Sequence, residues 1–305
     1  MHILMTGATG FIGTQLVRNL TTQNHQLTII TGRPQEARLA FSGTHQYLNW
    51  TEFYSLPEDF VADVVIHLAG ESVAAARWST PQKEKLIESR VTLTSKIIAK
   101  LQTLKIHPQT FISASAVGIY GDRGNELLTE DSNKGEGFLA DLTSRWESVL
   151  FTESNIPHTR KIALRFGLVF GRGGFLEKLI PMAPYGLVGK MGNGQQWQSW
   201  ISIKDIVKII DFLLVNKSIK GPINAVAPNP LTQSELASLI CIIFGGRKGI
   251  PVPKWALKMA LGEMSDLMLF SQKVSAQKIT DAGFDFEFKS AVEALEAIEL
   301  EYSKK

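Results

Sequence analysis

The first thirty residues constrain the fold of this 305-residue chain more than any other stretch. An apolar run at residues 2–5 leads straight into Gly7, Gly10 and Gly13. An amphipathic segment follows, and then a second apolar run at residues 27–30. Gly7 permits a tight turn off a strand, Gly10 lets backbone approach a pyrophosphate, and Gly13 lets a helix pack closely on a sheet. We therefore predict a strand, a glycine turn, a helix and a parallel second strand.

This unit is typical of dinucleotide binding, because backbone N–H groups at the helix start and the helix dipole hold phosphates. The end of the second strand indicates which dinucleotide. A carboxylate there would hydrogen-bond the ribose hydroxyls of NAD, but Gly32 and Arg33 stand there instead. The Arg33 guanidinium suits a 2′-phosphate, with Arg38 as a candidate helper, so we predict NADP rather than NAD. The alternative is an arginine that is merely solvated.

Composition narrows the class of protein. With 44% hydrophobic and 20% charged residues the chain can build a large core, and its formal net charge is only +3. Because the Lys and Arg residues form no basic run, we expect no nucleic-acid partner. Cys241 lies in an apolar helical pattern and is predicted to be core, and the histidines show no metal-ligand spacing. Without a signal peptide or a bilayer-spanning apolar run, we expect a cytoplasmic protein that does not enter a membrane.

A second segment is predicted to line the same crevice. Residues 63–70 form an apolar run that ends in Leu68, Ala69 and Gly70, which predicts a buried parallel strand. Small residues at its end let a nucleotide lie against the backbone, and His67 is expected to serve packing and hydrogen bonding. A long helix is predicted over residues 80–104. The expected cofactor-binding residues are Gly7, Thr9, Gly10, Phe11, Ile12, Gly13, Gly32, Arg33, Leu68, Ala69, Gly70 and Arg90.

A serine-rich strand end brings in a family resemblance. The strand predicted at residues 110–114 runs on to Ser115 and then to Tyr120-Gly121, which resembles the extended short-chain dehydrogenase/reductases, the superfamily of nucleotide-sugar epimerases and dehydratases. In that superfamily a hydroxyl at the strand end hydrogen-bonds the reacting oxygen of the substrate. The resemblance assigns this role to Ser115, with Ser113 as fallback. Tyr120, Glu71 and ordered water are candidates for proton transfer.

The superfamily's catalytic tyrosine and lysine are absent. That pair lies four residues apart on the next helix, and the lysine lowers the tyrosine's pKa. In the helix predicted from residue 137, Leu139 and Thr143 stand at those positions, and none of the five tyrosines has a lysine four residues later.

The missing pair, together with six motifs, resembles one atypical subgroup. It is the epimerase-like family of extended short-chain reductases that ends in a C-terminal domain of unknown function. The resemblance implies an NADP-type cofactor and leaves the substrate unassigned. The motifs are Gly70-Glu71-Ser72, Arg77-Trp78, Ser89-Arg90-Val91, residues 117–121, Arg145-Trp146-Glu147 and residues 171–174.

The rest of the chain completes a predicted α/β fold, a Rossmann-type doubly wound parallel sheet with a smaller, mainly helical C-terminal substrate lobe. We predict a strand at residues 160–169 that carries Arg165, either a structural ion pair or a phosphate contact. Asp205 is predicted as a structural charge at a helix start. The sheet domain is predicted at residues 1–170 and 195–227, and the lobe at residues 171–194 and 228–305. The lobe's methionines are either core or the wall of an apolar substrate pocket.

These features predict an NADP-dependent oxidoreductase or epimerase-like enzyme that acts on a small carbonyl or hydroxyl compound, nucleotide-sugar-like ones included. The alternative is an NADP-binding sensor or interaction protein that has lost catalysis. A P-loop is excluded, since no Gly-x-x-x-x-Gly-Lys-Ser/Thr occurs. We expect a small-molecule substrate and a monomer or homodimer.

Overall fold

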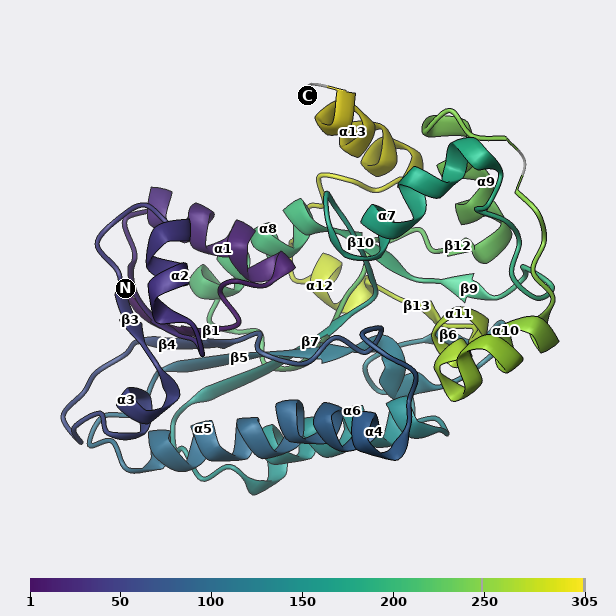
Figure 1. The fold of residues 1–305 in the computed structure, drawn as a ribbon. Helices are drawn as coiled ribbons and strands as arrows, with labels where there is room; N and C mark the ends of the chain where they lie inside the picture. Colours follow the sequence, from purple (N-terminus) through teal and green to yellow (C-terminus); the bar gives the residue numbers. More distant parts are fainter. Residues whose placement is uncertain (248, 304–305) are drawn as a thin grey trace.

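The computed structural model describes residues 1–247 and 249–303. Its centre is a seven-stranded parallel sheet in the order β11-β7-β5-β4-β1-β2-β3 (Figure 1). The order reverses between β1 and β4, which opens a crevice beyond the carboxyl ends of these two strands. The strands are β1 (His2–Thr6), β2 (Gln26–Ile30), β3 (Gln46–Leu48), β4 (Val64–His67), β5 (Thr110–Ala116), β7 (Arg160–Phe166) and β11 (Gly221–Ala225).

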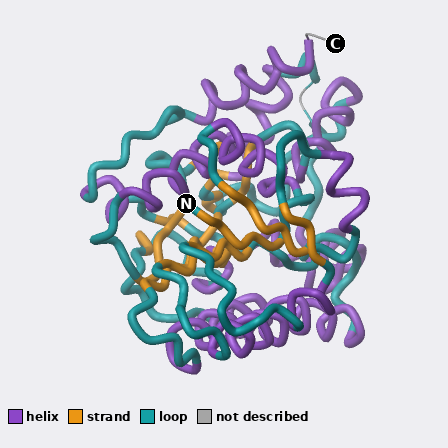
Figure 2. The backbone as a smooth tube through the Cα atoms, turned by 90° about the vertical axis from the view of Figure 1, so that its left-hand side faces the viewer, coloured by secondary structure: helices purple, strands orange, loops and turns teal. Residues whose placement is uncertain are grey.

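Helices cover both faces of the sheet, as Figures 1 and 2 show. One face carries α1 (Phe11–Thr22), α8 (Ile203–Val215) and α12 (Gln277–Asp281), and α2 (Pro34–Ala40) lies beside α1. The other carries α4 (Thr80–Ile87), α5 (Leu93–Gln102) and α6 (Phe138–Ser148), with α3 (Trp50–Tyr54) near its edge. Side chains alternate along β1, so that Ile3 and Met5 pack toward α1 while Leu4 packs toward α5. Coverage on both faces explains why the strands read as unbroken apolar runs.

Apart from α8, β11 and α12, the chain beyond β7 builds a smaller, largely helical region at one end of the sheet (Figure 1). Its own core includes Phe170, Trp200 and Cys241, which confirms that the cysteine is a core residue. The predicted lobe includes residues 248, 304 and 305, which lie outside the described residues. Its helices are α7 (Gly174–Leu179), η4 (Ile180–Tyr185), α9 (Gln233–Ile243), α10 (Lys254–Leu261), η5 (Gly262–Ser265), α11 (Asp266–Leu269) and α13 (Ala291–Ser303).

Three pairs of short strands connect this region to the rest. They are β8 (Leu168–Phe170) with β10 (Trp200–Ser202), β9 (Trp197–Gln198) with β12 (Leu231–Thr232), and β6 (Leu127–Leu128) with β13 (Lys273–Val274). Among residues 1–247 and 249–303, each helix is too short or too polar to span a lipid bilayer.

Some predicted elements differ in their bounds. The strand expected at residues 160–169 is two strands, because β8 leaves the main sheet to pair with β10. The helix expected at residues 80–104 is divided by a π-helical turn, η1 (Glu88–Thr92), and a second π turn, η3 (Val149–Glu153), follows α6. Such turns are rare in proteins overall, but many of those that occur lie at functional sites. The periodicity of the sequence did not indicate these two turns. A 3-10 turn, η2 (Val117–Tyr120), follows β5.

Candidate functional site

The predicted glycine turn lies at the carboxyl end of β1. At two of its glycines, Gly7 and Gly13, the surrounding backbone leaves no room for a side chain. Gly7 has a φ of +75°, and a Cβ atom on it would lie 2.5 Å from the carbonyl carbon of Leu68. A Cβ atom on Gly13 would lie 2.0 Å from the carbonyl oxygen of Gly7. The ends of β1 and β4 and the start of α1 therefore meet with backbone against backbone, as the spacing of the glycines predicts.

The N-terminus of α1 is open to a ligand. Its N-cap residue, Gly10, supplies no side-chain cap, and the first turn contains no acidic residue. Thr9 and Gly10 are both exposed. The first N–H groups of a helix have no partner within the helix, so this terminus can accept an anion such as a pyrophosphate. The cradle thus fits a dinucleotide, and no side chain fills it.

Arg33 lies beyond the carboxyl end of β2, where a 2′-phosphate group is expected. Its side chain is 72% exposed and forms an ion pair with Glu36 at 3.1 Å. Exposed ion pairs of this kind contribute little to stability, so a phosphate can replace the Glu36 carboxylate as the partner of Arg33. The neighbouring Gly32 has nothing within 4 Å of its Cβ position. Arg38 lies with its guanidinium 5.7 Å from the ring centre of Tyr47.

A buried histidine joins β1 to β4 beneath the crevice. His67 is fully buried, with Nδ1 2.6 Å from Thr6 Oγ1 and Nε2 2.9 Å from Thr94 Oγ1. Thr94 donates its own proton to the carbonyl of Arg90, so His67 must carry its proton on Nε2. Nδ1 then accepts from Thr6, whose oxygen also accepts from the N–H of Ala69. Burial, with the charge of Arg90, lowers the pKa of His67 to about 3, so it is neutral and structural, as expected.

Arg90 lies in the π turn η1 and extends beneath the loop that follows β4. Its Nη2 donates to the carbonyl of Glu71 at 2.8 Å, and its guanidinium stacks 5.4 Å from the ring centre of Trp146. The Cβ position of Gly70 is 3.5 Å from Arg90 Cζ. Burial lowers the pKa of Arg90 to about 10. No carboxylate lies within ion-pair distance of it among residues 1–247 and 249–303, so this cation can take an anionic ligand.

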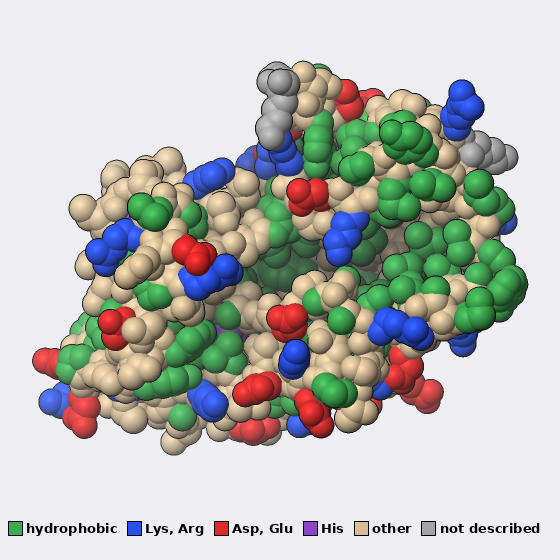
Figure 3. All heavy atoms as spheres, viewed as in Figure 1, with side chains coloured by type: hydrophobic (Ala, Val, Ile, Leu, Met, Phe, Trp, Pro, Cys, Tyr) green, Lys and Arg blue, Asp and Glu red, His purple; other side chains and the backbone are tan. Residues whose placement is uncertain are grey.

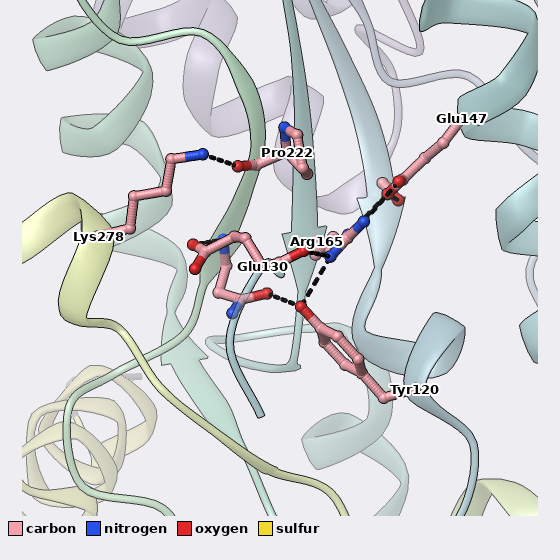
Figure 4. A network of polar contacts seen from close by, with 8 residues as sticks. Tyr120, Glu130, Glu147, Arg165, Pro222 and Lys278 are labelled. Atoms are coloured by element: carbon pink, nitrogen blue, oxygen red, sulfur yellow. Dashed lines mark hydrogen bonds and ion pairs between the residues drawn. The ribbon is translucent and has the colours of Figure 1, made fainter. Parts of the chain in front are cut away.

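The two predicted catalytic hydroxyls lie in one buried polar network, of which Figure 4 shows Tyr120, Glu147 and Arg165. Ser115 is 4% exposed and donates to Glu147 Oε1 at 2.6 Å. Tyr120 is 0% exposed, donates to Asn224 Oδ1 at 2.7 Å and accepts from Arg165 Nη1 at 2.8 Å. Burial raises the pKa of Tyr120 to about 12. Neither hydroxyl is open to a substrate, so their catalytic role stays a prediction that this environment does not favour.

Glu147 and Arg165 form the centre of that network. Arg165 donates Nε to Oε1 at 2.9 Å and Nη2 to Oε2 at 2.7 Å, and both side chains are under a tenth exposed. Of the two alternatives for Arg165, the structure therefore shows a structural ion pair. Ser113, the second choice for the hydroxyl that contacts the substrate, is also buried and donates a hydrogen bond to the carbonyl of Ala114. Sequence reasoning named Glu147 only as part of a motif, since its partners come from other elements.

The positions of the superfamily's tyrosine and lysine are packed against η2. A Cβ atom on Gly118 would lie 3.3 Å from Leu139 Cβ and 3.8 Å from Thr143 Oγ1. Thr143 is 3% exposed, while Leu139 is partly exposed. An aliphatic side chain therefore stands at the end of β5, where that superfamily presents a phenol.

Phe11 links the glycine turn to the smaller region. The Cβ positions of Gly171, Gly173 and Gly174 lie 2.9, 2.8 and 3.0 Å from atoms of its ring. The turn after β8 thus wraps around a residue of the candidate cofactor site. The three glycines within residues 171–174 are the sequence signal that could have indicated close packing against a bulky side chain such as Phe11. Figure 3 shows a hollow between the sheet domain and this region, with hydrophobic side chains in its depth.

Comparison with known proteins agrees with this geometry. Residues 3–225 match the model of the NAD dependent epimerase/dehydratase family, and residues 252–298 match a domain of unknown function, DUF1731. The chain belongs to the NAD dependent epimerase/dehydratase family. Asp205 connects the two matched segments, because its carboxylate accepts hydrogen bonds from the backbone N–H groups of Glu287 and Phe288.

Similar proteins cover nearly the whole chain. The epimerase family protein SDR39U1 homolog, chloroplastic, of Arabidopsis thaliana is 33% identical over 98% of this chain and 86% of its own. Epimerase family protein YfhF of Bacillus subtilis is 34% identical over 97% of both. The crystal structure of human epimerase family protein SDR39U1 with NADPH has a TM-score of 0.88 and 27% identity, and covers 98% of this chain and 99% of that one. A nucleoside-diphosphate sugar epimerase from Corynebacterium glutamicum has a TM-score of 0.77 and 30% identity, and covers 99% of this chain and 58% of that one.

Proposed function

We propose that this protein is an NADP-dependent oxidoreductase or epimerase-like enzyme that acts on a small carbonyl or hydroxyl compound. One observation carries the proposal: the uncapped start of α1 lies at the crevice between β1 and β4, with the exposed guanidinium of Arg33 beyond β2. The human relative crystallised with NADPH supports the choice of cofactor.

The chain's own residues divide the work of holding the cofactor. The turn from Gly7 to Gly13 would hold the pyrophosphate, Arg33 the 2′-phosphate, and Leu68 to Gly70 the backbone side of the nucleotide. Arg90 would add a positive charge beneath that loop. When bound, the nicotinamide gives or takes a hydride at the substrate carbon that carries oxygen. Residues 171–194 and 228–305 are the proposed substrate lobe.

The proton route does not use a tyrosine and lysine pair. We propose that Ser115 and Tyr120 act as positioning residues that hold η2 and α6 together through Glu147 and Arg165. The raised pKa of Tyr120 makes it a poor proton donor or acceptor near neutral pH. The proton that accompanies the hydride then passes between the substrate oxygen and water, and we expect slow turnover.

The test is direct. NADPH is titrated into the full chain by calorimetry, and its oxidation is then followed at 340 nm against a panel of aldehydes, ketones and nucleotide-sugars. We expect micromolar binding and measurable oxidation with at least one carbonyl compound. Absence of NADPH binding would refute the proposal.

The second candidate function is an NADP-binding sensor that has lost catalysis. The buried hydroxyls of Ser115 and Tyr120 favour it. Binding of NADPH without oxidation by any member of the panel would decide for the sensor.

A further inference from the structure

A cavity of about 690 Å³ lies at the amino ends of β7 and β11. Arg160, the first residue of β7, and Gly221, the first residue of β11, both line it. The two strands are parallel to the rest of the sheet, so this end is opposite to the carboxyl ends that form the cofactor crevice. The volume lies within the range of roughly 300–1,000 Å³ that is usual for small-molecule sites. The cavity is therefore separate from the proposed cofactor site and large enough for a ligand.

The lining of this cavity is positively charged. Arg160 and Lys161 come from the start of β7, Lys220 directly precedes β11, and Lys278 comes from α12. Among residues 1–247 and 249–303, no Asp or Glu lines the cavity, and none of these four cations forms an ion pair. Four cations without a carboxylate attract an anion.

The acidic side chains of the two neighbouring helical segments do not neutralise these cations. Glu153 of η3 accepts a hydrogen bond from the hydroxyl of Ser148, and Asp281 of α12 accepts one from the amide of Gln277. Both partners are neutral.

Arg160 has a structural task. Its guanidinium donates to the carbonyls of Leu213, Asn216 and Ile219 and to Thr110 Oγ1, which engages all its N–H groups. The first two carbonyls belong to the C-terminal end of α8, so the charge of Arg160 offsets the negative end of that helix. Three lysines remain for a ligand.

Backbone carbonyls hold two of these lysines in place. Lys161 Nζ donates to the carbonyl of Ser154 at 3.0 Å. Lys278 Nζ donates to the carbonyl of Pro222 at 2.7 Å, as Figure 4 shows, and to that of Lys220 at 3.5 Å. A carbonyl carries no net charge, and an ammonium group has three donors, so each lysine keeps its charge and at least one N–H group for a ligand. Burial lowers the pKa of Lys161, the direction expected of an ammonium group without an anionic partner.

We propose that this cavity is a second ligand site, which binds an anion that contains phosphate and carries more than one negative charge. Lys161, Lys220 and Lys278 are its ligands, because ammonium groups bind phosphate oxygens through charge-assisted hydrogen bonds. A soluble phosphorylated metabolite and a phospholipid headgroup share this chemistry. The inference goes beyond the proposed function and does not depend on it, since the site lies at the other end of the sheet.

The experiment uses inorganic pyrophosphate as the probe. The full chain is first saturated with NADPH, which keeps pyrophosphate out of the turn at residues 7–13, and pyrophosphate is then titrated by calorimetry in low-salt buffer. We expect one equivalent to bind with a Kd on the order of 100 µM. In a second arm, sedimentation with phosphatidylcholine vesicles that contain phosphatidic acid tests the headgroup as the source of the phosphate.

Variants then place the probe. Lys220→Gln and Lys161→Gln should each weaken pyrophosphate binding by about tenfold, because each removes one ammonium contact. Lys220 is exposed, so its substitution should not disturb folding. Lys85→Gln, which changes an exposed lysine of α4 outside the cavity, should leave binding unchanged.

The two arms distinguish the sources of the phosphate. Pyrophosphate binding without sedimentation indicates a soluble metabolite, whereas sedimentation that Lys220→Gln abolishes indicates a headgroup. Absence of binding in both arms overturns the inference, as does binding that Lys220→Gln and Lys161→Gln leave at the wild-type level. The variant comparison decides the inference even if NADPH does not bind, so its failure is distinct from failure of the proposed function.

Discussion

The buried histidine beneath the crevice should make the stability of the fold depend on pH. His67 is neutral in the folded chain because burial lowers its pKa from 6.5 to about 3. In the unfolded chain the ordinary value near 6.5 applies. The unfolded state therefore binds a proton below pH 6.5 that the folded state does not. The part of the folding stability that depends on a neutral His67 is fully present above about pH 6.5 and is lost as the pH falls toward 3.

The magnitude follows from the size of that shift. Between pH 7 and pH 5 the unfolded imidazole becomes almost fully protonated while the folded one stays neutral, which lowers the free energy of unfolding by about 2 kcal/mol. The cause is the loss of hydration for a charge in a site that offers only the hydroxyls of Thr6 and Thr94.

Urea unfolding at pH 7, 6 and 5 measures the effect. Wild type and His67→Gln are compared, with His158→Gln, an exposed histidine, as the matched control. His67→Gln should be less stable at pH 7 but should lose about 2 kcal/mol less than wild type on going to pH 5. The control should follow wild type. If His67→Gln keeps the full wild-type slope, the histidine is not buried and neutral as described.

Further substitutions test the contacts of the site. Glu147→Ala leaves Arg165 buried without its carboxylate and should lower the free energy of unfolding by about 3–5 kcal/mol in urea titration; a loss below about 1 kcal/mol would refute the structural ion pair. Gly13→Ala places a methyl group 2.0 Å from the carbonyl oxygen of Gly7, so it should weaken NADPH binding at least tenfold and lower Tm. The control, Gly32→Ala, places its methyl group where no atom lies within 4 Å and should leave Tm unchanged. Equal Tm values for the two glycine variants would contradict the close packing of α1.

Most of the sheet could be predicted because its signals are local. Apolar runs that end in glycine or small residues predict β1 and β4, and the structure confirms both strands. The divided strand at residues 160–169 could not be predicted, since its second part pairs with a strand about thirty residues later in the chain.

The site was less predictable because its environment depends on tertiary contacts. A serine-rich strand end and a tyrosine look alike whether they face solvent or a buried ion pair. Only the fold shows that Ser115 and Tyr120 meet Glu147 and Arg165. The glycine turn, in contrast, has its function in the backbone itself, so residue spacing was sufficient to predict its geometry.

The central claim is that the turn from Gly7 to Gly13, with Arg33 beyond β2, holds NADP. Calorimetric dissociation constants for NADPH and NADH, measured on wild type, Arg33→Asp and the control Lys217→Asp, test it most directly, since Lys217 is exposed and the two variants change charge equally. We predict that wild type prefers NADPH by at least about tenfold, that Arg33→Asp loses this preference through weaker NADPH binding, and that the control keeps it. Equal loss of both cofactors in Arg33→Asp, or no preference in wild type, would contradict the account.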